Sequence, residues 1–217
     1  MEIGRKGITG LTALFFMMLS LPLSSASSYD VIVVRGDVPT DYTIASIYAS
    51  TQKIPLVLVD PDNIESPIMQ ELSGYNNKGY SNLLIIGGQN AISASVEDKL
   101  SGMGFSVNRL WDWNRYGTAA RVAIDLWGKS EDVIITNGED YTGFLISQFI
   151  ALERGAPILL AMNDTLPGET EDAVKKLGST SAILVNCGRD LPPVLREMGL
   201  SIETIAVSYT HLRAHET

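Results

Sequence analysis

The sequence predicts an α/β fold made of two tandem copies of one unit. Each copy is expected to have three layers and a mostly parallel sheet of Rossmann-like or Toprim-like topology. A segment that opens at Asp30 with Asp-Val-Ile-Val-Val-Arg-Gly-Asp returns at Asp132 as Asp-Val-Ile-Ile-Thr-Asn-Gly-Glu, and this spacing of 102 residues holds without a gap over more than twenty positions. Within each copy, short apolar runs alternate with stretches of helical period, which is typical of strand–helix–strand units around a parallel sheet.

The elements of the first copy can be placed in order. Nearly continuous apolar runs, expected of strands covered on both faces, lie at 30–35, 54–59, 82–86 and 105–110. Apolar residues three and four apart indicate the helices, namely Ile44, Ile47 and Tyr48; Val96, Leu100 and Met103; and Ala119, Val122, Ala123 and Leu126. The second copy repeats this order but stops after one strand beyond Gly199, so we expect it to lack the fourth helix.

Proline and glycine indicate where helices begin and end. A proline in the first turn costs no hydrogen bond, so helix starts are expected at Ser66-Pro67 and Leu166-Pro167-Gly168. Glycines that follow the apolar stripes predict left-handed helix ends, at Gly104, Gly128, Gly178 and Gly199.

Two terminal segments are expected to lie outside the fold, which leaves the copies at 27–128 and 129–207. Residues 1–26 combine two basic residues, an apolar run and small residues ending at Ala26, the pattern of a cleaved signal peptide; a retained membrane anchor is the alternative. Residues 208–217 break off from the preceding pattern and are interpreted as a non-native tail. The alternative for the tail is metal binding by His211 and His215.

Composition and charge exclude or disfavour several classes of function. Lys and Arg number 16 and Asp and Glu 25, and the net charge of −9 disfavours a nucleic-acid partner. The one cysteine, Cys187, permits no internal disulfide and is interpreted as a small buried thiol. Residues 27–207 contain no histidine, which excludes serine–histidine–acid triads, cysteine–histidine pairs and zinc hydrolase sites there. We expect no cofactor, no metal and no membrane span after the signal peptide.

A glycine turn is the first candidate binding feature. Gly87 and Gly88 end an expected strand, and the residues up to Ser93 lead into an expected helix. In one interpretation the N–H groups and the helix dipole hold an anion. In the other, the glycines only make a tight turn and Ser93 or Ser95 caps the helix. The pattern is neither a dinucleotide fingerprint nor a P-loop.

The densest aromatic and charged cluster lies at a strand-to-helix connection, and its main members are Arg109, Trp111, Trp113, Arg115 and Tyr116. In the functional interpretation these side chains stack on sugar rings or clamp carboxylate and phosphate groups, and a strand end is a common place for ligands. In the structural interpretation Asn114 caps the helix, Tyr116 packs beneath the sheet and Arg115 pairs with a carboxylate.

Acidic residues follow the first strand of each copy: Asp37 and Asp41, then Glu139 and Asp140. They are either acid/base pairs or residues that cap the next helix and complement its dipole. Gly143 stands where the first copy has Asp41, so no carboxylate pair is kept in both copies. This pattern favours a scaffold over catalysis.

With these motifs in order, the sequence resembles the cell wall binding repeat 2 family of secreted envelope and S-layer proteins, from about Tyr29 to Val207. The matching segments are Leu84-Ile85-Ile86-Gly87-Gly88 followed by Ala91-Ile92-Ser93; Asn114-Arg115-Tyr116-Gly117-Thr118-Ala119; Asn137-Gly138; and Gly155-Ala156-Pro157-Ile158-Leu159-Leu160. The resemblance implies α/β repeats, usually three in tandem, that pack together and hold a protein non-covalently to an anionic wall polymer without catalysis.

We therefore expect a secreted, non-enzymatic module at the cell surface that binds an anionic cell-wall polymer and whose repeats associate with one another. The candidate ligand-binding residues are Asp41, Gly87, Gly88, Ser93, Arg109, Arg115, Tyr116 and Asn137. Two further hypotheses stay open. One is an S-layer or envelope structural protein that binds other protein subunits, which salt dependence would separate from polymer binding. The other is an extracytoplasmic α/β sugar-phosphate enzyme.

Overall fold

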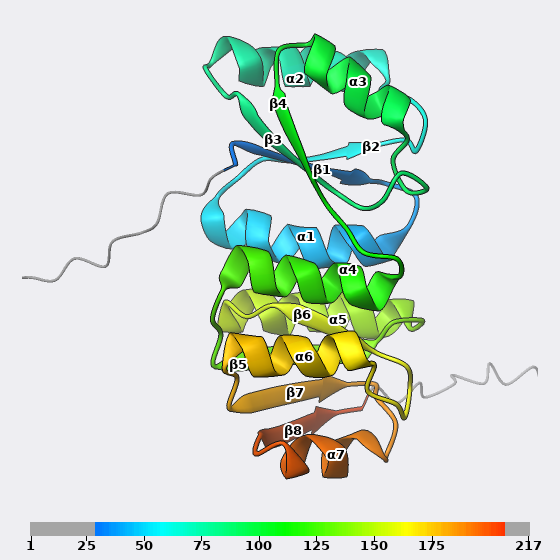
Figure 1. The fold of residues 1–217 in the computed structure, drawn as a ribbon, viewed down its shortest axis with the longest axis vertical. Helices are drawn as coiled ribbons and strands as arrows, with labels where there is room; N and C mark the ends of the chain where they lie inside the picture. Colours follow the sequence, from blue (N-terminus) through cyan, green and yellow to red (C-terminus); the bar gives the residue numbers. More distant parts are fainter. Residues whose placement is uncertain (1–28, 207–217) are drawn as a thin grey trace, which may run out of the picture.

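The computed structural model describes residues 29–206, which fold as two α/β repeats stacked on one another (Figure 1). The first repeat contains β1 (Val31–Arg35), α1 (Pro39–Gln52), β2 (Leu56–Val59), α2 (Ser66–Asn77), β3 (Asn82–Ile86), α3 (Ala94–Gly102), β4 (Ser106–Leu110), α4 (Arg115–Val122) and the π-helical turn η1 (Ala123–Trp127). The second contains β5 (Asp132–Asn137), α5 (Tyr141–Arg154), β6 (Ile158–Ala161), α6 (Gly168–Leu177), β7 (Ser181–Val185), α7 (Leu191–Glu197) and β8 (Ser201–Ile205). The expected signal peptide and the expected tail lie outside the described residues.

Each repeat has a four-stranded sheet in which all neighbouring strands run parallel, in the orders β2-β1-β3-β4 and β6-β5-β7-β8. The registers of the two sheets are equivalent, because Ile32 pairs with Leu56 and, 102 residues later, Ile134 pairs with Ile158. The predicted fold class is confirmed. The four strands of the first copy begin within two residues of the expected positions.

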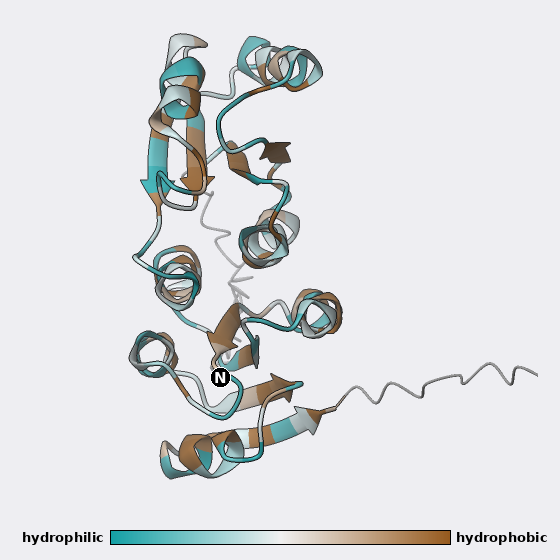
Figure 2. Ribbon diagram, turned by 90° about the vertical axis from the view of Figure 1, so that its right-hand side faces the viewer, coloured by the Kyte–Doolittle hydropathy of each residue, from teal (hydrophilic) through white to brown (hydrophobic). Residues whose placement is uncertain are grey.

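Helices cover both faces of the sheets. In the first repeat α2 and α3 lie on the outer face, whereas α1 and α4 lie between the first sheet and the second repeat (Figure 1). In the second repeat α5 lies on the opposite face of the sheet from α6 and α7 (Figure 2). The last described element of the second repeat is β8, and the expected lack of a fourth helix concerns residues outside the described range. None of the helices in this range combines the length and the apolar character needed to cross a membrane.

The expected helix boundaries are largely confirmed. α2 begins at Ser66 with a proline in its first turn, and α6 begins directly after Pro167. Positive φ angles occur at all four glycines that were expected to end helices. The end of α1 was not predicted: this helix closes on Lys53, which takes the left-handed conformation itself.

The two repeats share one apolar core. A single cluster contains Ile44 and Ile47 from α1 together with Phe144 from α5. Helix α1 packs against α5, and α4 packs against α6 and the edge strand β6. Gln148 Nε2 donates a hydrogen bond of 2.9 Å to Ser46 Oγ, which joins positions 102 residues apart and therefore equivalent in the repeat. The expected association between repeats is present within this chain, and it fixes the strand ends of the first sheet against the second repeat.

Candidate functional site

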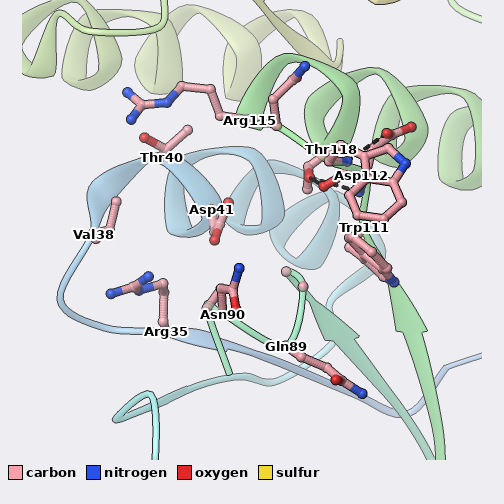
Figure 3. Close-up of a pocket in the computed structure, with 15 residues that line it drawn as sticks. Arg35, Val38, Thr40, Asp41, Gln89, Asn90, Trp111, Asp112, Arg115 and Thr118 are labelled. Atoms are coloured by element: carbon pink, nitrogen blue, oxygen red, sulfur yellow. Dashed lines mark hydrogen bonds between the residues drawn. The ribbon is translucent and has the colours of Figure 1, made fainter. Parts of the chain in front are cut away.

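A cavity of about 590 Å³ opens at the carboxyl ends of β1, β3 and β4 (Figure 3). It lies where the first turns of α1 and α4 meet the glycine turn after β3 and the loop after β4, and its lining residues are Arg35, Val38, Thr40, Asp41, Gly87, Gly88, Gln89, Asn90, Ala91, Trp111, Asp112, Trp113, Asn114, Arg115 and Thr118. Ligands of open α/β sheets bind at this end of the strands. Four of the candidate residues therefore meet in one pocket: Asp41, Gly87, Gly88 and Arg115.

The glycine turn is shaped by close approach. Gly87 has a φ of 122°, and a Cβ on Gly88 would lie 3.0 Å from Cε3 of Trp111. The turn is closed by the N–H groups of Ala91 and Ile92, which donate to the Gly88 carbonyl at 2.9 and 3.0 Å. Gly87 is thus required by the backbone conformation and Gly88 by the close approach of the Trp111 ring, as the structural interpretation holds.

Ser93 does not lie in the pocket and does not act as expected. It occupies the N-cap position of α3, but its side chain makes no capping hydrogen bond. Its hydroxyl instead lies 2.9 Å from that of Ser95. Of the two serines expected to cap the helix, Ser93 takes the N-cap position, but neither makes a side-chain capping bond because the two hydroxyls pair with each other.

Arg109 holds the glycine turn in place from behind. Its Nε and Nη2 donate to Glu97 Oε2 at 3.0 and 2.7 Å, and its Nη1 donates to the Gly87 carbonyl at 2.7 Å. The side chain is largely buried and does not line the cavity. All three of these contacts are internal, so the geometry gives Arg109 a supporting position beneath the pocket.

The other two arginines near the pocket differ in how their charge is compensated. Arg35 forms a bidentate contact with Asp37, with two bonds of 2.6 Å, which raises the pKa of Arg35 and lowers that of Asp37. Arg115 donates through Nη1 to the carbonyl of Gly138 at 2.7 Å, and within residues 29–206 it forms no ion pair. The expected pairing of Arg115 with a carboxylate is wrong, because its partner is a backbone carbonyl of the second repeat.

The aromatic side chains of the cluster divide between the pocket and the core. Trp113 is 90% exposed at the rim, and its ring meets that of Trp111 edge to face with centroids 5.4 Å apart. Tyr116 packs against the shared core, and its ring fills the space where Gly138 of the second repeat has no side chain. Asn114 Oδ1 accepts from the N–H of Gly117 at 2.7 Å, which confirms the predicted helix cap.

The first turn of α1 brings two polar side chains without partners to the pocket. Thr40 is 2% exposed, and its buried hydroxyl has no hydrogen-bond partner. No hydrogen bond or ion pair joins the Asp41 side chain to any described residue. Burial raises the pKa of Asp41 to about 6, although the charges of Arg35 and Arg115 act in the opposite direction.

The polar side chains at the end of β5 and just after it are engaged internally, and Gly143 takes the place of Asp41 in the second repeat. Asp140 caps α5 through Oδ1 at 3.1 Å from the N–H of Thr142, and its Oδ2 accepts from Asn186 Nδ2 at 2.7 Å. Asn137 Oδ1 accepts from the N–H of Glu139 at 3.1 Å. Asp140 is therefore a helix cap, as the structural interpretation holds, and Asn137 lies far from the first-repeat pocket in sequence and outside its lining.

Cysteine chemistry and metal binding find no support in the described part of the chain. Burial raises the pKa of the Cys187 thiol to about 12, and the thiol donates to the Ile135 carbonyl at 3.4 Å. Residues 29–206 contain no group of three or more His, Cys, Asp and Glu placed to hold a metal. His211 and His215 lie outside the described residues.

Sequence signals anticipated only part of this pocket. The acidic positions, the glycine turn up to Ser93 and the aromatic–basic cluster were singled out beforehand, but Thr40 was not. Nothing in its local pattern marks it, because it reaches the pocket only through the packing of α1 against the turn after β3.

The fold and the pocket together define a class of protein: a tandem α/β binding module with a polar, aromatic-rimmed cavity at its strand ends. Residues 14–97 match the family model of cell wall binding domain 2 (CWB2). The match covers the first repeat from β1 into α3, and over this part the chain is similar to a cell wall binding domain.

Relatives with curated sequences extend the match over most of the chain. An uncharacterized protein of Pyrococcus abyssi is 34% identical over 176 residues, which are 81% of this chain and 53% of the relative. The N-acetylmuramoyl-L-alanine amidase LytC of Bacillus subtilis is 28% identical over 154 residues, 71% of this chain and 30% of the amidase. The chain thus spans about half of the Pyrococcus protein and less than a third of the amidase.

Solved structures show the same fold. Cwp6 from Clostridium difficile superposes with a TM-score of 0.72 at 23% identity, over 81% of this chain and 29% of its own. Cwp8 from the same organism superposes with a TM-score of 0.70 at 23% identity, over 82% of this chain and 31% of its own.

Proposed function

We propose that the chain is a non-catalytic attachment module, exported by means of residues 1–26, whose first repeat binds an anionic wall polymer in the strand-end pocket. The observation that carries this proposal is the pairing of an exposed tryptophan with an arginine that has no carboxylate partner at one cavity. Trp113 exposes its ring at the rim, and Arg115, which lines the same cavity, has guanidinium N–H groups beyond the one that donates to Gly138.

Each of these groups suits one part of an acidic polysaccharide. An indole ring gives a flat apolar surface on which a sugar ring stacks, and pockets for small molecules combine such surfaces with a few fixed polar groups. A guanidinium binds carboxylate or phosphate through two parallel hydrogen bonds. The chain as a whole has a net charge of −9, so the attraction for an anion must be local to this pocket.

The acidic side chains of the pocket support binding over catalysis. Asp112 is used by the backbone, because its Oδ1 accepts from the N–H of Trp113 at 2.6 Å. The backbone N–H of Asp112 is also used within the fold, because it donates to Thr118 Oγ1 at 3.0 Å. Asp41 is then the one carboxyl in the lining without a structural partner. A single carboxyl does not make an acid/base pair.

An exposed apolar face of α5 supports the part of the proposal that concerns tandem repeats. Phe149 is 71% exposed, whereas Ile47, its equivalent 102 residues earlier, is fully buried where α1 packs on the second repeat. Leu145 is likewise exposed, and its equivalent Thr43 is buried. An apolar patch of this kind is typical of an interaction surface. We propose that this face seats a further repeat, as the family resemblance implies.

Co-sedimentation with isolated cell envelopes tests the proposed function. The wild-type chain is expected to sediment with envelopes at low salt, to lose binding when the acidic polymers are extracted, and to regain it when they are added back. Trp113→Ala is expected to weaken binding about tenfold without a change in stability, because the ring is exposed. Arg121→Ala is the matched control, because Arg121 lies on α4 and pairs with Asp125 away from the pocket.

Two results would contradict the proposal. Binding that survives polymer extraction would point to a protein subunit of the envelope as the partner. Equal binding by wild type and Trp113→Ala would show that the polymer binds elsewhere than at this pocket.

A further inference from the structure

Asp41 is a pocket carboxyl that the fold itself does not use. It lies in the first turn of α1, and its Oδ2 is 3.3 Å from the place where Gly87 would carry a Cβ, so the turn closes directly over it. Figure 3 shows the side chain pointing from α1 into the pocket, between Arg35 and Arg115. A mostly buried carboxyl without a hydrogen bond is costly unless it is neutral or a ligand supplies a partner.

A second unsatisfied group lies beside it. The hydroxyl of Thr40, one residue earlier in the same turn, is buried and has no partner, although Thr40 lines the same cavity. Buried polar atoms without partners are rare in folded proteins, and one that lines a cavity next to an unpaired carboxyl indicates a place for a ligand. The first N–H groups of α1 point to the same end of the helix, where the dipole favours negative charge.

The charges around Asp41 come from three elements. Arg35 and Asp37 at the end of β1 neutralise each other, Arg115 faces Asp41 from α4, and Asp112 lines the cavity from the loop after β4. The turn of residues 87–91 has no titratable side chain. An anion bound by Arg115 would therefore lie next to Asp41, and the protonation of Asp41 decides whether that contact attracts or repels.

We propose, building on the function proposed above, that Asp41 is the specificity-determining residue of the pocket and makes anion binding depend on acid. As a neutral carboxyl it donates its O–H to an oxygen of the anion that Arg115 holds, and as a carboxylate it repels that anion. Binding then takes up one proton at Asp41 whenever the pH lies above the pKa of this carboxyl in the ligand-free protein. The expected ligand is an acidic sugar or a phosphate-bearing unit of the polymer.

The direction of the effect follows from the sign of the shift. Since Asp41 titrates near 6 in the free pocket, the dissociation constant should be flat below about pH 5 and rise by up to tenfold per pH unit above about pH 6. Between about pH 5 and pH 8 the loss of affinity should approach a hundredfold. A pocket that relied on Arg115 alone would show no such dependence, because a guanidinium stays charged throughout.

The test is a binding titration of the full chain at about pH 5 and pH 8, with extracted acidic polymer as one probe and sulfate as the other. Sulfate keeps its charge over this range, so its pH dependence reports on the protein alone. Asp41→Asn keeps the shape and an N–H donor but does not titrate. It is expected to bind equally at both pH values and about a hundredfold more tightly than wild type at the higher one. Asp172→Asn, on the exposed surface of α6, is the matched control and should titrate like wild type.

The outcomes separate this inference from the proposed function. Binding of polymer and sulfate that is independent of pH in the wild type, or that stays pH-dependent in Asp41→Asn, would overturn the role of Asp41 and leave the pocket as the polymer site. No binding of either probe at any pH would overturn both proposals.

Discussion

Replacement of Asp41 by asparagine should stabilise the folded protein at neutral pH and leave it unchanged in acid. Burial raises the pKa of this carboxyl from 3.8 to about 6 in the folded state, a rise of about two units. Each unit corresponds to about 1.4 kcal/mol, so keeping the ionised carboxyl buried costs about 3 kcal/mol at pH 7. Asp41→Asn removes this cost while it preserves the size of the side chain.

The pH window follows from proton counting. Between about pH 4 and pH 6 the folded chain holds a proton on Asp41 that the unfolded chain has lost, so the free energy of unfolding of the wild type falls as the pH rises through this range. The variant has no such slope from this position. Its advantage should therefore be near zero at about pH 3.5 and reach about 3 kcal/mol at about pH 7.

Urea denaturation at a series of pH values, followed by far-UV circular dichroism, measures this difference directly. Asp172→Asn serves as the control, since an exposed aspartate changed to asparagine should shift stability by less than about 0.5 kcal/mol. The reasoning is refuted if Asp41→Asn gains nothing at neutral pH. It is also refuted if the gain is the same at every pH, because the effect would then not come from ionisation.

Four further substitutions test the fold around the pocket and between the repeats. Gly87→Ala should lower the free energy of unfolding by about 1–3 kcal/mol, because φ is 122° there; an unchanged urea midpoint would contradict this. Ile47→Ala should lower the free energy of unfolding by about 2–5 kcal/mol, whereas Phe149→Ala at the equivalent exposed position should lower it by less than about 0.5 kcal/mol. Thermal unfolding measures both, and an equal loss in the two variants would contradict this expectation. Asn114→Ala should cost about 1 kcal/mol through loss of the α4 cap, seen as faster amide exchange in the first turn of that helix; unaltered exchange there would count against the cap.

The sequence anticipates the fold because the information is local and repeated. Apolar runs such as that from Val31 to Val34 are buried on both faces, and the same run recurs 102 residues later in the equivalent strand. Proline and glycine mark most helix ends for backbone reasons that need no tertiary context. The end of α1 at Lys53 is not predicted, because a residue with a Cβ rarely takes the left-handed conformation.

The site is anticipated only in part because its chemistry depends on contacts between distant elements. Arg115 donates to a carbonyl of the second repeat, and Arg109 donates to Glu97 on α3. Neither partner can be identified from sequence spacing. Thr40 matters because its buried hydroxyl has no partner, and the lack of a contact cannot be predicted from a pattern of residues. The aromatic density of Trp111 and Trp113, by contrast, is visible in the sequence and does lie at the rim.

The claim that the first-repeat pocket binds a wall polymer is tested most directly by titrating the purified chain with extracted acidic polymer while following tryptophan fluorescence. Trp113 is exposed at the rim, so stacking of a sugar on its ring should shift the emission and saturate as the pocket fills. The account predicts a saturable shift at low salt that disappears in Trp113→Ala and persists in Arg121→Ala. A polymer that binds with equal affinity to all three proteins would contradict it.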